Sequence, residues 1–204
     1  IDMPGERPGI MPSREWKQGA KQEAWFNGDT INVSIGQGFM LTTPLQLAVM
    51  SARIASKGKL LKPQLVKSID GVATQPVEVR EPINMSDEYW DYVHKAMRDV
   101  VHSPRGTAKG ISNGLNYEIA GKTGTAQVIS ISAEEEYDSS KIDKSQWDHA
   151  LFVAFAPMDD PQIAVGLIVE NGEHGSSAAA PIARLVIDEY MKSKSKQSQV
   201  IANN

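Results

Sequence analysis

Residues 121–128 read GKTGTAQV, a short run in which two glycines interrupt residues that favour β-strands. A strand at the edge of a sheet leaves backbone N–H and C=O groups free to pair with an extended peptide. Gly124 would let such a ligand approach without a side chain in its way. Lys122 and Thr123 supply a positive charge and a hydroxyl, which together suit a carboxylate. The run therefore predicts an edge strand that binds an extended ligand ending in a carboxylate.

The composition around this run is that of one globular domain large enough to bury a core, with 204 residues, of which 41% are hydrophobic. The 21 basic and 25 acidic residues give a net charge of -4 without a basic stripe, which argues against a nucleic-acid partner. The absence of cysteine excludes disulfides and thiolate catalysis. The chain opens on Ile1 rather than on methionine, so we expect a piece of a longer protein.

Two helices are well marked before this run. Residues 43–46 read TPLQ, a capping box with proline at the first helical position, and Gly58 closes the helix that follows. Ser86 can cap a second helix that runs to about Val101 and carries one apolar stripe. Both segments therefore predict helices, each with one apolar face that can pack against another element.

The remaining segments are predicted from alternation, glycine and proline. We expect residues 1–29 to be extended and irregular, 30–35 to form a short strand or loop, and 132–147 to form a long exposed loop. Strands are expected at Ile119–Ile131 and in two hairpins, one formed by 64–70 and 77–80, the other by 150–156 and 162–170. Ser177 is expected to cap a closing helix that ends near Met191. Residues 1–191 would then form the domain, and 192–204 a polar, disordered tail.

Many of these stretches resemble, in the same order, the monofunctional class B penicillin-binding proteins. The matching stretches are 2–6, 11–12, 16–17, 28–30, 36–38, 43–46, 104–108, 121–128, 148–149, 154–157 and 170–172. The resemblance is to the C-terminal part of the transpeptidase domain. It implies an α/β (α+β) fold shared with the serine β-lactamases, in which an antiparallel sheet packs against helices.

The resemblance also implies an activity, that of a serine-type peptidoglycan D,D-transpeptidase. A serine attacks the D-Ala-D-Ala bond of a stem peptide, and the acyl group then passes to an amine of a neighbouring strand; β-lactams mimic this substrate. In this chain, Lys122 and Thr123 would hold the carboxylate, Gly124 would admit the ligand, and the backbone N–H of Thr125 would form half of the oxyanion hole. No cofactor is implied. The longer protein would serve cell-wall elongation and cell shape with other membrane proteins, at the periplasmic face of the bacterial inner membrane.

The nucleophile of that chemistry is not found in this sequence. Ser56–Lys59 falls at the end of a predicted helix and Ser193–Lys196 falls in the polar tail, so neither pair offers a buried lysine facing a serine. The Ser-x-Asp match at Ser68–Asp70 falls in a predicted hairpin and out of family order. We therefore expect both missing motifs, Ser-x-x-Lys and Ser-x-Asn or Ser-x-Asp, to lie upstream of Ile1.

The other candidate site residues favour structural roles. The resemblance implies that Asp148 and His149 begin the strand after the Lys-Thr-Gly strand, where a role in orienting the intervening loop, in a second shell around the site, is favoured over catalysis. His94, His102 and His174 lack partners at metal-ligand spacing, so no metal site is expected. Two alternatives to the enzyme remain: a degenerate homologue that binds peptides or β-lactams without acylation, and an interaction domain in which Lys122 is only a surface charge.

Overall fold

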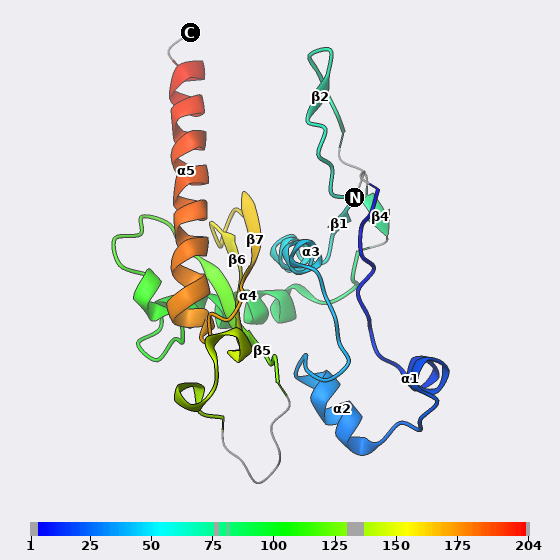
Figure 1. Cartoon of the computed structure of the whole chain (residues 1–204). Helices are drawn as coiled ribbons and strands as arrows, with labels where there is room; N and C mark the ends of the chain where they lie inside the picture. Colours follow the sequence, from blue (N-terminus) through cyan, green and yellow to red (C-terminus); the bar gives the residue numbers. More distant parts are fainter. Residues whose placement is uncertain (1–3, 76–77, 81, 130–136, 203–204) are drawn as a thin grey trace.

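A three-stranded antiparallel sheet lies at the centre of the molecule. The structure is a computed structural model that describes residues 4–75, 78–80, 82–129 and 137–202 (Figure 1). The strands lie in the order β5 (Ala120–Ala126), β6 (His149–Ala156) and β7 (Ile163–Val169). This confirms the expected β6–β7 hairpin. β5 ends earlier than predicted, because the N–H of Val128 bonds the Asp148 side chain instead of extending the ladder; Ser130 and Ile131 lie outside the described residues.

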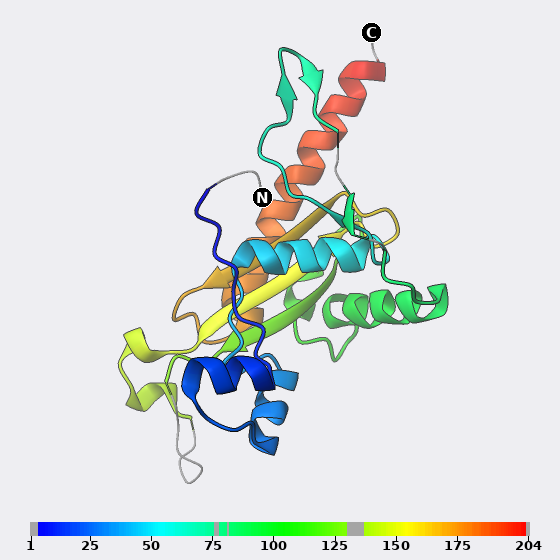
Figure 2. The ribbon, with the colours of Figure 1, turned by 90° about the vertical axis from the view of Figure 1, so that its right-hand side faces the viewer.

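Helices cover both faces of this sheet, which makes three layers (Figure 2). Ala120 lies opposite Phe155 in the register, and both pack with Ala55 of α3 (Pro44–Ala55) and Met97 of α4 (Asp87–His102). Phe152 and Ala154 point to the other face, because side chains alternate along a strand, and they pack with Ile187 of α5 (Ala180–Ala202). The predicted fold class is confirmed.

Helix α3 begins at the predicted capping box. The Thr43 hydroxyl accepts the Gln46 N–H at 3.1 Å, and the Gln46 side chain accepts the Thr43 N–H at 2.9 Å. The helix ends before Gly58, whose φ of 96° favours glycine. Helix α4 begins after Ser86 as predicted, although the Ser86 side chain makes no capping bond. Both helix predictions are confirmed.

The N-terminal expectations are wrong, because this segment forms helices α1 (Arg14–Lys21) and α2 (Asn27–Ser34). The Ser13 hydroxyl caps α1 by accepting the Trp16 N–H at 3.1 Å. The Asp29 carboxylate accepts the Phe26 N–H and the Lys17 ammonium, each at 2.7 Å. Lys17 is 3% exposed and lies over the Phe26 ring. These polar contacts, made by residues that precede the alternating run, favour helix over strand at 30–34.

The first predicted hairpin has different partners. Asp70 and Gly71 both have positive φ and join β2 (Ser68–Ile69) to β3 (Val72–Ala73) through a two-residue turn. Because this turn closes directly after Ile69, β4 (Glu78–Arg80) pairs instead with β1 (Leu60–Leu61). The predicted pairing of 64–70 with 77–80 is therefore wrong; Val77 lies outside the described residues. The hairpin β2–β3 projects from the body (Figure 1).

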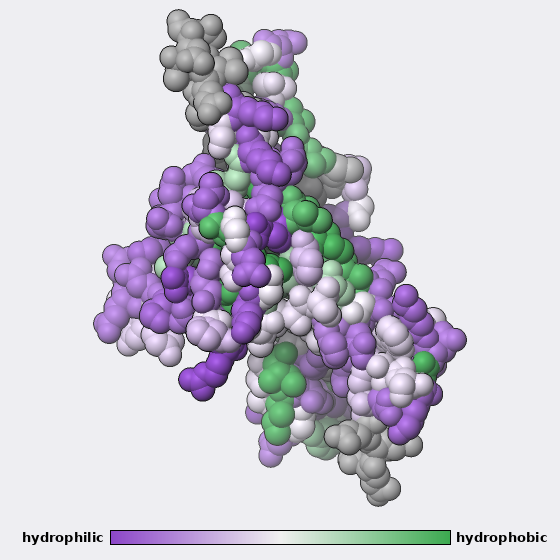
Figure 3. All heavy atoms as spheres, turned by 90° about the vertical axis from the view of Figure 1, so that its left-hand side faces the viewer, coloured by the Kyte–Doolittle hydropathy of each residue, from purple (hydrophilic) through white to green (hydrophobic). Residues whose placement is uncertain are grey.

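The C-terminal helix is longer than predicted. A π-helical turn, η4 (Gly175–Ala179), precedes α5, so Ser177 lies inside a turn rather than at a cap. Helix α5 passes the predicted end at Met191 and reaches Ala202, because no glycine or proline stops it. The division at residue 191 remains a prediction. Figure 3 looks at the α5 side of the molecule and shows hydrophobic side chains among hydrophilic ones; Leu185 of α5 is 67% exposed.

Short 3-10 helices complete the chain. They are η1 (Lys109–Ile111), η2 (Ser139–Lys141) and η3 (Lys144–Gln146). Asp138 and Asp143 cap the last two by accepting the N–H groups of Ser140 and Ser145. The second half of the expected loop at 132–147 is thus built from capped turns, and 132–136 lies outside the described residues.

Candidate active-site edge

The outer edge of β5 presents free backbone groups near the predicted binding residues. The Gln37 side-chain amide donates to the Thr125 carbonyl at 2.7 Å, and the Lys122 ammonium donates to the Thr123 carbonyl at 2.7 Å. Neither donor belongs to β6, so both carbonyls point away from β6. In an antiparallel strand the N–H and C=O of one residue point to the same side. The N–H of Thr125 therefore faces the open edge, as an oxyanion-hole donor must.

The two side chains predicted to bind a carboxylate lie beside this edge. Lys122 is exposed and Thr123 is half-buried. The Thr123 hydroxyl lies 3.2 Å from the hydroxyl of Thr107. The structure brings together Lys122, Thr123 and the Thr125 N–H on one strand. Their roles in binding stay predictions.

Gln37 and Thr107 are neighbours of this edge that the sequence did not single out. Both lie in stretches that resemble the family, 36–38 and 104–108, so the resemblance could have pointed to them. Their spatial link to β5 spans 88 and 16 residues, respectively. No local periodicity reports contacts over such separations, and only the folded chain reveals them.

Gly124 has a packing partner as well as an open edge. A Cβ added at Gly175 would lie 2.3 Å from the Leu151 carbonyl oxygen and 2.9 Å from that of Gly124. A Cβ added at Gly124 would lie 3.3 Å from the Leu151 Cβ. The turn before α5 therefore packs directly on the strand at Gly124. This contact gives the glycines a structural role beside the predicted admission of a ligand.

Asp148 and His149 tie the segment between β5 and β6 together. Asp148 is 7% exposed, and its carboxylate accepts the Val128 N–H at 3.3 Å. His149 Nδ1 accepts the Asn171 N–H at 3.0 Å, and the Asn171 side chain donates to the Trp147 carbonyl at 2.8 Å. These contacts are with loop backbone rather than with Lys122. They favour the structural role for Asp148 and His149.

The two Ser-x-x-Lys matches form no serine–lysine pair. The Ser56 hydroxyl bonds the carbonyls of Arg53 and Lys59, and the Ser193 hydroxyl bonds the carbonyl of Tyr190. Among the described residues, no group of three histidine, aspartate or glutamate side chains could hold a metal ion. In the same part of the chain, no helix is both long enough and apolar enough to cross a membrane.

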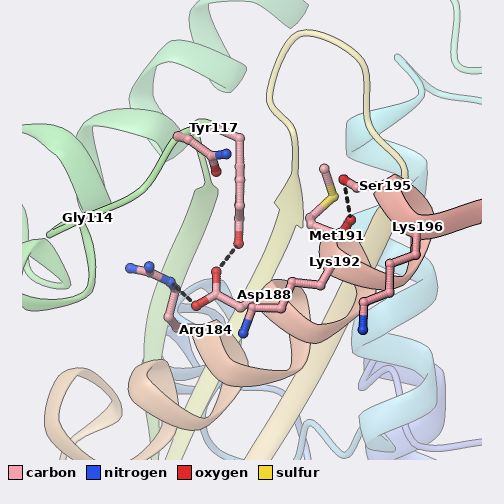
Figure 4. A pocket seen from close by; sticks show the side chains of 9 residues that line it. Gly114, Tyr117, Arg184, Asp188, Met191, Lys192, Ser195 and Lys196 are labelled. Atoms are coloured by element: carbon pink, nitrogen blue, oxygen red, sulfur yellow. Dashed lines mark hydrogen bonds and ion pairs between the residues drawn. The ribbon is translucent and has the colours of Figure 1, made fainter. Parts of the chain in front are cut away.

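A separate pocket of about 750 Å³ lies between α5 and the segment before β5 (Figure 4). There the Tyr117 hydroxyl donates to the Asp188 carboxylate, which also accepts Arg184 Nε at 2.7 Å. Burial and the bond to Asp188 raise the pKa of Tyr117. Burial alone would raise the pKa of Asp188, but the bonds from Tyr117 and Arg184 outweigh it, so that pKa is lowered. Both pKa shifts keep Tyr117 protonated and Asp188 ionised near neutral pH.

An antiparallel sheet covered by helices, with an open edge at the Lys-Thr-Gly strand, fits the class of penicillin-binding transpeptidases that the sequence resembles. Comparison with known proteins gives the same class. Residues 1–188 match the family described as the penicillin binding protein transpeptidase domain. The chain belongs to this family.

Particular relatives make the assignment narrower. The chain is 42% identical to the peptidoglycan D,D-transpeptidase MrdA of Acinetobacter baumannii and 39% identical to that of Haemophilus influenzae, over 100% and 97% of its length. It spans only 30% and 31% of those relatives. Within class B, the quoted stretches point to penicillin-binding protein 2, and this resemblance is confirmed.

Solved structures of penicillin-binding protein 2 are also similar to this chain. Pseudomonas aeruginosa penicillin-binding protein 2 in complex with WCK 5153 is 44% identical, with a TM-score of 0.79, over 93% of this chain and 40% of that one. Helicobacter pylori penicillin-binding protein 2, in a complex with MreC, is 30% identical with a TM-score of 0.75. The match covers 92% of this chain and 32% of that one.

Proposed function

We propose that this chain forms the ligand-binding side of a peptidoglycan D,D-transpeptidase active site. One observation carries the proposal: the Thr125 N–H faces the open edge of β5, beside Lys122 and Thr123, in a chain of the transpeptidase family. An extended acyl donor would add to this edge as a strand. Its carbonyl would meet the Thr125 N–H, and its carboxylate would meet the Lys122 ammonium and the Thr123 hydroxyl.

The reaction needs a nucleophile from sequence outside this chain. An upstream serine would attack the carbonyl of the D-Ala-D-Ala bond, the leaving D-alanine would take a proton, and the acyl-enzyme would pass to an amine of a second stem peptide. The exposed apolar side chains of α5, such as Leu185, agree with further sequence that completes the domain. β-Lactams would acylate the same serine.

The setting of the longer protein is part of the proposal. We place it at the periplasmic face of the bacterial inner membrane, held by an anchor outside this chain. The MrdA relatives and the complex of Helicobacter pylori penicillin-binding protein 2 with MreC support partners in cell-wall elongation.

The test is acylation of the longer protein by a labelled penicillin. Lys122→Ala should lower the second-order acylation rate constant by about 10- to 150-fold, because a charge-assisted hydrogen bond contributes about 1.5 to 3 kcal/mol. Thr123→Val should lower it less, since it removes a neutral hydroxyl. Lys67→Ala, on the projecting hairpin β2–β3, is the matched control and should acylate normally.

Two outcomes would contradict the proposal. Normal acylation of Lys122→Ala, or a loss explained by a lower melting temperature, would leave Lys122 as a surface charge. Intact mass distinguishes the rival binding module, which would bind penicillin without gaining its mass. The isolated chain should form no adduct, because neither of its Ser-x-x-Lys matches pairs a serine with a lysine.

A further inference from the structure

Gln37 is held in a tight turn that follows α2. Its neighbours Gly36 and Gly38 have φ values of 78° and 70°, which favour glycine. The Gln37 N–H donates to the Asn32 carbonyl at 2.9 Å, and the Gly36 N–H donates to the Val33 carbonyl at 3.0 Å. The backbone of Gln37 is thus fixed at the end of α2, and its side chain reaches β5.

The end of this side chain occupies one of the groups that an added strand would use. The Gln37 amide nitrogen lies 2.7 Å from the Thr125 carbonyl oxygen, on the open edge of β5. The neighbouring outward carbonyl, that of Thr123, is covered by the Lys122 ammonium. The outward carbonyls of Thr123 and Thr125 therefore both have a side-chain donor where the N–H of a ligand strand would lie.

A ligand strand would compete with Gln37 for this carbonyl. In a hydrogen-bonded antiparallel pair, two residues exchange both of their N–H···O=C bonds. A ligand residue whose carbonyl meets the Thr125 N–H would therefore direct its own N–H to the Thr125 carbonyl. Under the proposed function, that residue is the one whose carbonyl is attacked. Its amide N–H and the Gln37 amide would need the same acceptor.

We propose that the Gln37 side chain is a placeholder for the amide N–H of the acyl donor. It caps the Thr125 carbonyl while the site is empty and leaves when an acyl donor with an N–H at this position binds. In the empty site it blunts an edge that would otherwise pair with any extended chain. Acyl donors that carry this N–H restore the bond that Gln37 gives up. This inference rests on the proposed function.

Two β-lactam probes distinguish a placeholder role of Gln37 from a role in positioning β5. Benzylpenicillin carries an amide N–H on the carbon beside its lactam carbonyl, whereas a carbapenem carries none there. The variants are Gln37→Ala and Gln37→Met; methionine keeps the length of the side chain but has no donor. Gln18→Ala, an exposed glutamine on α1, is the matched control. All are made in the longer protein, with melting temperature measured in parallel.

Both Gln37 variants should be acylated about 2- to 10-fold faster by benzylpenicillin, the range that one neutral hydrogen bond supports. With the carbapenem they should change by less than about 2-fold, because this ligand forms no bond that displaces Gln37. Gln18→Ala should match the wild type with both probes.

Slower acylation with both probes would overturn the placeholder and make Gln37 a residue that positions β5. Unchanged rates with both would also overturn it. Failure of the wild type to be acylated by either probe would refute the proposed function itself. That result differs from a normal wild type whose Gln37 variants do not respond.

Discussion

The contact between Gly175 and β5 predicts that one added methyl group disturbs both stability and the candidate site. In Gly175→Ala, the new Cβ would lie 2.3 Å from the Leu151 carbonyl oxygen, a backbone atom that cannot rotate away. Real Cβ contacts stay above 3.0 Å, so the turn η4 or strand β6 must move by about 0.7 Å. Overpacking of this kind costs about 1 to 3 kcal/mol.

The assay is thermal unfolding beside acylation in the longer protein. For a domain of this size, each kcal/mol lowers the melting temperature by about 2 to 4 °C, so Gly175→Ala should lose about 2 to 12 °C. The same Cβ would lie 2.9 Å from the carbonyl oxygen of Gly124, so it should also push on β5 next to the Thr125 N–H. Misplacement of about 1 Å can cost about 100-fold in rate, so acylation should fall by up to that factor.

Gly19→Ala is the matched control. Gly19 is exposed on helix α1, and an added Cβ would meet nothing within 4 Å. Alanine should stabilise that helix by about 0.5 to 1 kcal/mol. The reasoning is refuted if Gly175→Ala melts as high as Gly19→Ala, because the backbone contact would then be too loose to matter.

Two further perturbations follow from the same structure. Asn171 has a φ of 52°, and its side chain donates to the carbonyls of Ser145 and Trp147. Asn171→Ala should therefore lower the free energy of unfolding by about 2 to 4 kcal/mol. Asn171→Gly should lower it by about 1 to 3 kcal/mol, since glycine tolerates this φ. Urea denaturation checks the order, and equal losses would contradict the strain argument. His102 accepts the Ile119 N–H at 3.1 Å, and burial lowers its pKa. Its contribution to stability should be complete above its ordinary pKa of about 6.5 and be lost as the pH falls toward the lowered folded value, because only the unfolded chain then takes up the proton. In His102→Gln this slope should flatten in unfolding curves measured below about pH 6.5; an unchanged slope would show that His102 does not carry it.

Sequence signals were reliable where a local contact decides the structure. The capping box at Thr43 and Gln46 specifies where α3 begins, and both of its hydrogen bonds form. The β6–β7 hairpin likewise follows from two apolar runs around a proline-rich turn. The Lys-Thr-Gly strand was placed at an edge from the same kind of evidence, and β5 does lie at the edge of its sheet.

The predictions from sequence are wrong where the secondary structure or the strand pairing depends on a contact that leaves no periodic pattern in the sequence. Alternation at 30–35 favoured a strand, but Asp29 bonds both Phe26 and Lys17 and stabilises helix α2. The pairing of β4 with β1 depends on where the turn at Gly71 closes. Such contacts join residues through the folded chain, so single-sequence periodicity does not contain them.

The edge of β5 can be predicted from the sequence, whereas the contact that Gln37 makes with it is seen only in the structure. The open edge is a property of one strand and its glycines, which the run at 121–128 already contains. The donor that covers it comes from a turn 88 residues away, bracketed by glycines that fix its backbone. The two glycines favour such a turn, but nothing in their spacing states what the residue between them touches. A change at Gln37 should therefore alter ligand selection at β5 while leaving the strand itself intact.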